Sequence, residues 1–314
     1  MDRVVAVVVT YNRKILLDEC INAILNQTRK IDKIIIIDNN SSDGTFEMLK
    51  SKGYINNSII EYKKLEKNIG GAGGFFEGIK SAYIQNYNWI WIMDDDTIPK
   101  KNTLERLLKA KDNVKGKISF LASSVYGMNN EYMNVPIVDD GITNNGYADW
   151  YKYLEFNMVK IKTATFVSLL INREAIKKCG LPLKDYFIWG DDTEYTTRLT
   201  KYYGEAFLVG DSQVIHKRKN AKSLSVIEET NKDRLKMYYY NIRNNFVNIK
   251  TYSGKFEAFK YVLKNIIMIF KLLFSRQKFK YTKINTIIKG LNDGILKKYD
   301  YKAFKDRMKI EKFI

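Results

Sequence analysis

Short apolar runs alternate with polar, helix-like segments along the first hundred residues. We expect buried strands, at runs rich in β-branched or aromatic residues, over residues 4–9, 33–38, 59–62 and 89–93. Segments 15–26 and 75–87 carry apolar residues at helical spacing between these runs. This alternation predicts an α/β fold: a mostly parallel, doubly wound sheet flanked by helices, with right-handed crossovers.

The C-terminal part of the chain is basic and contains one long amphipathic segment. Residues 251–314 hold 16 Lys or Arg against 5 Asp or Glu. Residues 256–274 are dense in apolar side chains but interrupted by lysines, whereas a bilayer-spanning helix needs about 20 mostly apolar residues. We therefore expect an interfacial helix, or alternatively a helix that packs on the preceding domain or on a second subunit. The expected division is a domain over 1–250 and a helical tail over 251–314.

Three consecutive carboxylates, Asp94, Asp95 and Asp96, end the fourth expected strand. The carboxyl ends of parallel strands are where α/β folds bind ligands. Clustered carboxylates repel one another unless a cation lies between them, and their hard oxygens suit Mg²⁺ or Mn²⁺, which commonly bridge to a diphosphate. The alternative is an acidic loop or a helix N-cap.

Polar residues also follow the first two expected strands and precede the helix expected at 75–87. Asp38 can accept hydrogen bonds from a base or a ribose, whereas turn formation and helix capping explain residues 40–44. The glycine-rich stretch 70–74 reads as a loop that permits close approach of a diphosphate to a helix N-terminus, although it matches neither the dinucleotide nor the phosphate-loop pattern. The candidate nucleotide-binding residues at this edge are Thr10, Tyr11, Asn12, Arg13, Asp38, Asn68, Gly70 and Gly71.

A second acidic pair, Asp191 and Asp192, begins an expected helix over 192–199. In one interpretation one of these carboxylates is a general base, because the aromatic residues before the pair would raise its pKa towards the working range. In the other, Asp191 caps the helix and Glu194 is solvated. The only histidine, His216, ends another expected strand, where it is either structural or a third metal ligand beside the triplet.

The charge of the chain calls for an anionic partner. Lys and Arg number 53 against 35 Asp and Glu, a formal charge of +18. A nucleic-acid-binding protein, with the tail and residues 236–243 contacting phosphates and bases, is the alternative from another class. We expect no nucleic-acid partner, because acidic clusters in the ligand-binding crevice would repel a polyanion. The two cysteines are expected to be unpaired, and the first residues lead into a strand and not a secretory signal, which together predict a cytoplasmic protein.

Taken in order, these motifs resemble those of inverting family 2 glycosyltransferases, which have the Rossmann-like GT-A fold. The resemblance spans residues 4–220. The glycine-rich stretch and the Met-Asp-Asp-Asp sequence are most similar to bacterial galactofuranosyltransferases and the related rhamnosyltransferases. The motifs that carry the resemblance are Thr10-Tyr11-Asn12, Asp38-Asn39, Ser42-Asp43-Gly44-Thr45, Asn68 with Gly70-Gly71, Asp94-Asp95-Asp96, Asp191-Asp192 and His216.

The resemblance implies roles for these residues. Asp94, Asp96 and His216 would hold Mn²⁺ or Mg²⁺ against the donor diphosphate, and Asp94 and Asp95 would belong to the donor-binding set, with Asp95 contacting the ribose or the sugar. Asp192 aligns with the family's catalytic base. The family more often has a Glu-Asp pair there, so the choice between Asp191 and Asp192 stays open.

The resemblance also implies the substrates. The expected donor is UDP-galactofuranose, with dTDP-rhamnose as the alternative, and residues 126–153 would shape the donor pocket. The acceptor would be a hydroxyl of a glycan or of a lipid-linked sugar in bacterial surface polysaccharide synthesis, contacted by Trp150 and Trp189. A lipid-linked acceptor would place the protein on the inner face of the cell membrane, in contact with anionic lipid. A homo-oligomer is a further expectation.

Overall fold

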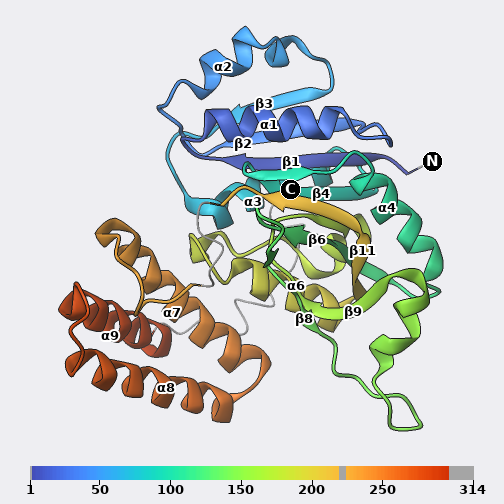
Figure 1. Cartoon of the computed structure of the whole chain (residues 1–314). Helices are drawn as coiled ribbons and strands as arrows, with labels where there is room; N and C mark the ends of the chain where they lie inside the picture. Colours follow the sequence, from blue (N-terminus) through green and yellow to red (C-terminus); the bar gives the residue numbers. More distant parts are fainter. Residues whose placement is uncertain (1, 219–223, 297–314) are drawn as a thin grey trace.

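The computed structural model describes residues 2–218 and 224–296. Within these residues an 11-stranded mixed sheet lies between two layers of helices, and three further helices pack beside it (Figure 1). The strand order is β3-β2-β1-β4-β10-β6-β11-β9-β8, with β5 paired to β11 and β7 paired to β6. The strands are β1 (Val4–Thr10), β2 (Lys33–Asp38), β3 (Ile60–Lys64), β4 (Trp89–Asp94), β5 (Thr97–Pro99), β6 (Ile118–Tyr126), β7 (Tyr132–Met133), β8 (Ile137–Val138), β9 (Met158–Thr163), β10 (Leu169–Asn172) and β11 (Glu205–His216).

The four N-terminal strands confirm the pattern predicted from the sequence. β3, β2, β1 and β4 are parallel neighbours, and their bounds agree with the expected runs to within two residues. The other half of the sheet is mixed, because β10 runs antiparallel to both β4 and β6. The doubly wound parallel arrangement therefore describes only the first half, and β10 joins it to the second.

The two faces of the sheet carry separate hydrophobic clusters. All of β1 is buried, and alternate residues point to opposite faces: Val5 and Val7 join the cluster beneath α3, α5 and α6, whereas Val4 and Val8 join the cluster beneath α1 and α4. This burial on both faces explains the unbroken run of apolar residues. The helices are α1 (Lys14–Leu25), α2 (Thr45–Ser51), α3 (Gly70–Ile84), α4 (Thr103–Ala110), α5 (Arg173–Cys179), α6 (Asp191–Tyr202), α7 (Lys232–Tyr252), α8 (Lys255–Leu273) and α9 (Lys280–Leu296), with short 3₁₀ segments η1 (Tyr54–Asn56), η2 (Lys111–Asn113), η3 (Asp149–Phe156) and η4 (Lys184–Tyr186).

The glycine-rich stretch corrects one expectation. It is not a loop before a helix: α3 begins at Gly70, five residues earlier than predicted. A Cβ on Gly74 would lie 2.5 Å from Val9 Cγ1, and one on Gly78 would lie 2.3 Å from Val7 Cγ1. These two glycines therefore let α3 pack directly on β1, and this close packing offsets the helix-destabilising effect of glycine.

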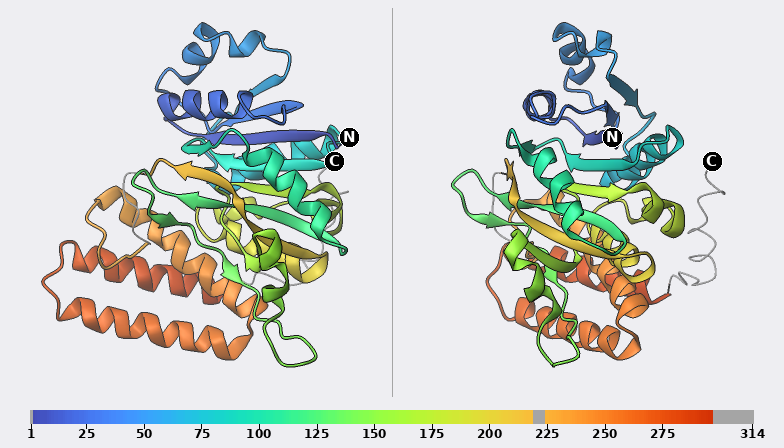
Figure 2. Two further views of the ribbon diagram at one scale, coloured as in Figure 1. Left: turned by 45° about the vertical axis from the view of Figure 1, so that its right-hand side comes forward. Right: turned by 90° about the vertical axis from the view of Figure 1, so that its right-hand side faces the viewer.

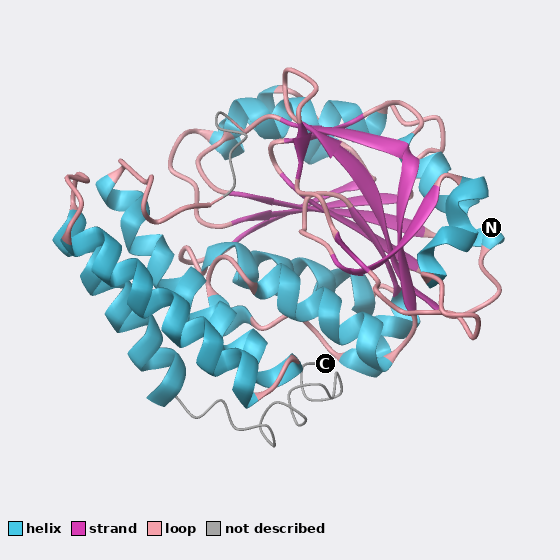
Figure 3. Cartoon of the chain, turned by 60° about the horizontal axis from the view of Figure 1, so that its bottom comes forward, coloured by secondary structure: helices cyan, strands magenta, loops and turns pink. Residues whose placement is uncertain are grey.

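The C-terminal helices α7, α8 and α9 pack on one another around their own apolar core (Figure 2). In the view of Figure 3 they lie beside the sheet at the end of the described chain. α8 confirms the helix expected over 256–274, and no described helix is long and apolar enough to cross a bilayer. The boundary expected at residue 250 falls in the last turn of α7, and the division into two domains stays a prediction. Expectations for residues 297–314 lie outside the described residues.

Candidate active site

The acidic triplet runs from the last residue of β4 into the turn before β5, at the carboxyl edge of the sheet. β5 folds back and pairs antiparallel with β11, with Thr97 opposite His216. This pairing brings the only histidine of the chain beside Asp96, although the two residues are 120 positions apart. Asp94 and Asp96 each offer an oxygen, and His216 a ring nitrogen, that all lie within 4.8 Å of one another.

The hydrogen bonds of His216 prepare this cluster for a cation. His216 Nδ1 lies 2.9 Å from Asn134 Oδ1, and His216 Nε2 lies 3.1 Å from Asp96 Oδ1. An amide oxygen only accepts, so Nδ1 carries a proton and donates it to Asn134, and this contact turns Nε2 towards the Asp96 carboxylate. Asp96 Oδ1 is buried, and apart from His216 Nε2 it has no hydrogen-bond donor among the described residues. A divalent ion fits this donor set of two carboxylates and one imidazole.

Asp94 is the third member of this cluster, and the neighbouring carboxylates repel its charge. Burial, followed by the charges of Asp96 and Asp95, raises the pKa of Asp94 well above its usual value. A proton or a metal ion relieves this repulsion, so the high pKa agrees with a cation-binding role.

Asp95 accepts hydrogen bonds from residues at and after the end of β1. Thr10 Oγ1 donates to Asp95 Oδ2 at 2.7 Å, and Arg13 Nη1 donates to Asp95 Oδ1 at 3.2 Å and to Asp96 Oδ2 at 2.7 Å. Burial raises the pKa of Asp95 to about 6. The Arg13 side chain is 49% exposed, so its guanidinium is both anchored on the triplet and accessible to an anion at this edge.

Residues after β1 and β2 tie two loops together. Asp38 is fully buried, and its oxygens accept hydrogen bonds from Ser41 N at 2.7 Å and from the Tyr62 hydroxyl at 2.6 Å. Asn12 Oδ1 accepts from the backbone N–H of residue 42 at 2.8 Å. Asp38 and Asn12 thus shape the loops, whereas Tyr11 is 45% exposed at the same edge.

The start of α3 meets the loop before the second acidic pair. Gly70 N donates to Asn68 Oδ1 at 2.8 Å, and Gly70 has a φ of 78°. A Cβ on Gly70 would lie 2.0 Å from Phe187 O, whereas a Cβ on Gly71 would meet no atom within 4 Å. Gly70 therefore permits the loop contact, and Gly71 leaves open space at the helix N-terminus.

The acidic pair begins α6. Burial, followed by the charge of Asp192, raises the pKa of Asp191, and burial also raises the pKa of Asp192. The charge of Asp191 contributes to the raised pKa of Asp94, so Asp191 lies near enough to the triplet to interact with it electrostatically. Asp192 Oδ1 accepts from Thr193 N at 2.7 Å, the hydrogen bond of a residue near a helix N-terminus.

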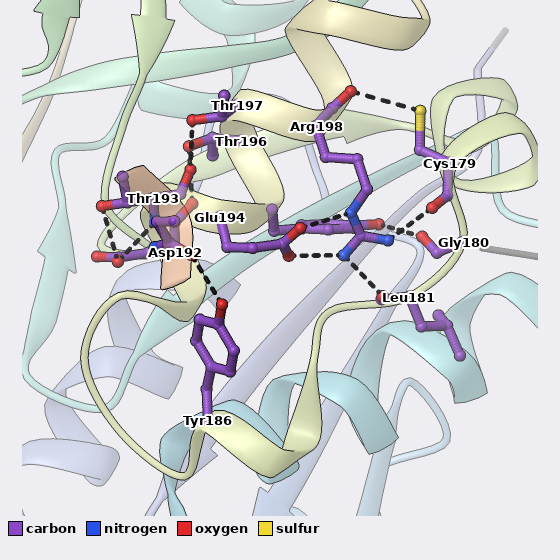
Figure 4. A network of polar contacts seen from close by, with 12 residues as sticks. Cys179, Gly180, Leu181, Tyr186, Asp192, Thr193, Glu194, Thr196, Thr197 and Arg198 are labelled. Carbon is purple, nitrogen blue, oxygen red and sulfur yellow. Dashed lines mark hydrogen bonds and ion pairs between the residues drawn. The ribbon is translucent and has the colours of Figure 1, made fainter. Parts of the chain in front are cut away.

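Glu194 is not solvated, in contrast to the structural alternative for this segment. Glu194 and Arg198 are 1% and 0% exposed and form a two-pronged ion pair at 2.8 and 3.0 Å (Figure 4). Arg198 also donates to the carbonyl oxygens of Cys179 and Leu181, and Tyr252 donates to Glu194 Oε1 at 2.7 Å. The network joins α6 to the segment after α5 and to the end of α7.

The two tryptophans expected at the acceptor side lie in different places. Trp189 directly precedes the acidic pair and packs edge-on against Tyr238 of α7, with ring centroids 5.1 Å apart. The structure does not bring Trp150 to this edge. Its neighbour Asp149 pairs with Lys160, which in turn pairs with Glu205, the first residue of β11, whereas His216 is the last.

Sequence reasoning missed three asparagines. Asn134, between β7 and β8, orients His216, and Asn244 and Asn248 of α7 bond the backbone before the acidic pair. For Asn244 and Asn248 the one signal in the sequence is a pair of amides four residues apart on the buried face of an amphipathic helix, whereas Asn134 has no such signal. The stretch 236–243, considered above as a nucleic-acid surface, includes three buried residues, Tyr238, Ile242 and Arg243.

Comparisons with known proteins relate the N-terminal part of the chain to one family. A family model described as Glycosyl transferase family 2 matches residues 5–180. Galactofuranosyltransferase GlfT1 of Mycolicibacterium smegmatis is 36% identical over 101 residues, 32% of each chain, and abequosyltransferase RfbV of Salmonella typhimurium is 36% identical over 97 residues, 30% of this chain and 28% of its own. The chain therefore matches about a third of the length of these curated relatives.

Two solved structures share the fold at low sequence identity. S. aureus TarS 1–349 in complex with UDP-GlcNAc superposes with a TM-score of 0.56 at 17% identity, over 93% of this chain and 80% of that one. GalNAc-T7 with UDP, GalNAc and Mn²⁺ superposes with a TM-score of 0.59 at 16% identity, over 98% of this chain and 57% of that one. Because the family model covers more than half of the chain and the architecture is that of these GT-A enzymes, the chain belongs to glycosyltransferase family 2 and has the GT-A fold.

Proposed function

We propose that the chain is a metal-dependent inverting glycosyltransferase that moves a sugar from a nucleoside diphosphate to an acceptor hydroxyl. One observation carries this proposal: the ligand atoms of Asp94, Asp96 and His216 converge within 4.8 Å, and the buried Asp191 of the second acidic pair lies near enough to act on Asp94 electrostatically. The three residues would hold Mn²⁺ or Mg²⁺, and a divalent ion bound there offsets the negative charge that grows on the departing diphosphate.

The acidic pair supplies the proton acceptor. Asp192, or Asp191 in its place, takes the proton of the acceptor hydroxyl as its oxygen attacks the anomeric carbon. The new C–O bond forms on the face opposite the diphosphate, whose bond to the sugar breaks, so the configuration inverts. Burial keeps the pKa of both carboxylates raised, which makes either one a stronger base than a solvated aspartate.

The donor site lies along the same edge. Arg13 offers a half-exposed cation for the diphosphate, and the open space at Gly71 lies at a helix N-terminus that favours an anion. UDP-galactofuranose is our first choice of donor, supported by the similarity to GlfT1, and dTDP-rhamnose is the alternative. The proposed donor-binding residues are Thr10, Tyr11, Asn12, Arg13, Asp38, Asn68, Gly70, Gly71, Asp94 and Asp95, and the proposed acceptor contact is Trp189.

A donor panel tests this function. Thermal unfolding is measured with Mn²⁺ and each of UDP-galactofuranose, dTDP-rhamnose and other nucleotide-sugars, because a ligand of the folded state raises the midpoint. We expect one donor to raise the unfolding midpoint, and chelator to abolish this increase. The same donor should be turned over, and Asp192→Asn or Asp191→Asn should abolish its turnover. Full turnover by the Asp96→Ala variant in chelator would overturn the metal role.

The outer face of α8 supports contact with a membrane. Large apolar side chains at helical spacing form a stripe on this face and are 39–89% exposed; they are Phe256, Phe259, Leu263, Ile266, Ile267, Phe270, Leu273 and Phe274. Exposed lysines at 255, 260, 264 and 271 lie on the same helix. This combination fits an anionic bilayer surface, where apolar side chains bury shallowly and lysines meet headgroups. We propose that this face docks on the cytoplasmic side of the cell membrane and so meets a lipid-linked acceptor.

Vesicle binding tests this contact in the full chain. Phe270→Asp places a charge in the stripe, and Tyr147→Asp, at a residue that is 73% exposed on the sheet domain, is the matched control. We expect Phe270→Asp alone to weaken sedimentation with vesicles of phosphatidylcholine and phosphatidylglycerol by at least about tenfold, and added salt to weaken binding of the unmodified chain. Equal binding by both variants would overturn the proposal. A dimer that Phe270→Asp dissociates would instead assign the stripe to an oligomer interface.

A further inference from the structure

The loop before the acidic pair has an uncommon backbone. Phe187 has φ 64° and ψ −61°, and Ile188 N donates to Tyr186 O at 2.7 Å, which closes a γ-turn around Phe187. Trp189 and Gly190 follow with φ of 60° and 89°. Bulky residues rarely adopt such angles, which cost on the order of 1–3 kcal/mol each and persist only where neighbouring groups enforce them.

Helix α7 supplies groups that enforce this turn. Asn244 Nδ2 lies within hydrogen-bond distance of three carbonyl oxygens, those of Tyr186 at 3.0 Å, Ile188 at 3.3 Å and Trp189 at 2.7 Å. Asn244 is fully buried. Most of the carbonyl groups of the turn therefore point at one side chain of a distant helix.

Asn248, one helical turn further along α7, holds the end of the loop. Its Nδ2 donates to Gly190 O at 2.8 Å, and its Oδ1 accepts from the Tyr186 hydroxyl at 2.8 Å. Gly190 O also accepts from Glu194 N at 3.0 Å, the first backbone hydrogen bond of α6. Asn248 thus contacts the residue that caps the helix on which Asp191 and Asp192 stand.

The opposite side of the turn rests on α3. Phe187 O accepts from Ala72 N at 3.1 Å, and Gly70 makes room for this carbonyl. The Phe187 ring stacks on Tyr240 of α7, with centroids 4.8 Å apart. The loop is therefore held between the start of α3 and the buried polar face of α7.

We propose that Asn244 and Asn248 are positioning residues for the acidic pair, because they fix the backbone from which Asp191 and Asp192 emerge. The inference rests on the proposed function and extends it to a helix outside the region that the family model matches. A proton acceptor must lie within hydrogen-bond reach of the attacking hydroxyl, and a displacement of about 1 Å can cost on the order of 100-fold in rate.

The positions of the proposed metal ligands predict that changing these asparagines lowers the rate and leaves nucleotide binding intact. Asp94, Asp96 and His216 lie at the ends of β4 and β11 and in the turn between β4 and β5, and none of the hydrogen bonds described for them involves Asn244 or Asn248. Relaxing the loop should therefore lower kcat while affinity for UDP with Mn²⁺ is retained. A general loss of folding would lower both together.

Three variants of the full chain separate these cases. Asn248→Asp keeps the side-chain volume and the acceptor for Tyr186 but replaces the N–H that reaches Gly190 O. Asn244→Ala removes the amide that reaches the carbonyl oxygens of Tyr186, Ile188 and Trp189, although Arg243 Nη2 still lies 3.4 Å from Tyr186 O. Asn265→Ala is the matched control, because Asn265 is 2% exposed in α8 and its described hydrogen bonds are to Tyr261 of its own helix.

The readouts are kcat and KM with UDP-galactofuranose, calorimetric binding of UDP with Mn²⁺, and hydrogen–deuterium exchange of the peptide 185–195. We expect Asn248→Asp and Asn244→Ala to lower kcat by at least about tenfold, to bind UDP within about threefold of the unmodified chain and to exchange faster over 185–195, whereas Asn265→Ala leaves all three unchanged. A folded Asn248→Asp variant with unchanged kcat and exchange overturns the inference. If the unmodified chain does not turn over this donor, the donor assignment fails instead, and the exchange of 185–195 decides the positioning role.

Discussion

Removing Glu194 should destabilise the fold more than removing most side chains of similar size. The Glu194 and Arg198 side chains are 1% and 0% exposed, so Glu194→Ala leaves a guanidinium buried without its counter-charge. Breaking such a pair costs about 3–5 kcal/mol, a large fraction of the 5–15 kcal/mol that typically stabilises a domain. The variant also removes the acceptor of the Tyr252 hydroxyl. The cost of losing this hydrogen bond is included in the figure of about 3–5 kcal/mol, because contributions within one network are not additive.

Urea unfolding followed by circular dichroism measures this cost, with the slope of the transition checked for constancy. Replacing both partners by apolar residues, as in Glu194→Leu with Arg198→Met, should recover much of the loss, because no charge then stays buried. Tyr252→Phe, which removes one hydroxyl, should cost about 1 kcal/mol. A loss below about 1 kcal/mol for Glu194→Ala, at an unchanged slope, would refute the reasoning that this pair is desolvated.

The remaining predictions concern the site. Asn134→Ala should weaken Mn²⁺ binding by about 10- to 100-fold in calorimetry, because His216 loses the partner that fixes its tautomer; unchanged affinity would remove Asn134 from the site. Of Asp191→Asn and Asp192→Asn, the variant at the base should lose turnover while binding UDP normally, and equal rates in both variants and the unmodified chain would exclude the pair. In chelator, stability should fall as pH rises from about 5 to 8, because the raised pKa of Asp191 lets the folded chain hold a proton that the unfolded chain has released. Asp191→Asn should flatten this pH dependence of the thermal midpoint, and a slope as steep as in the unmodified chain would contradict it.

Local pattern sufficed for the first half of the fold. The runs at β1, β2 and β4 are apolar on both faces because helices cover both faces of the sheet, so their sequences identify buried strands without reference to any partner. The acidic triplet was placed correctly at a strand end because polarity changes abruptly after Met93. The length and character of α8 were likewise predictable from its spacing of apolar and basic residues.

Strand direction was not predictable in the same way. β10 is four residues long, and its composition does not indicate whether it runs parallel or antiparallel to its neighbours. Its antiparallel direction between β4 and β6 depends on the path of the chain. The start of α3 was misplaced for a related reason. Glycine lowers helix propensity, and only the close approach of Gly74 and Gly78 to β1 shows why the helix contains them.

The sequence by itself determined which residue types gather at the carboxyl edge, because apolar runs that end in carboxylates are a local property of the chain. Tertiary structure alone decided how they combine. The β5–β11 pairing brought His216 to Asp96, and buried amides of α7 met the loop before Asp191 across more than fifty residues of sequence. These contacts join groups far apart in the chain, and their energies depend on distance and burial in space, which no local pattern of residues encodes.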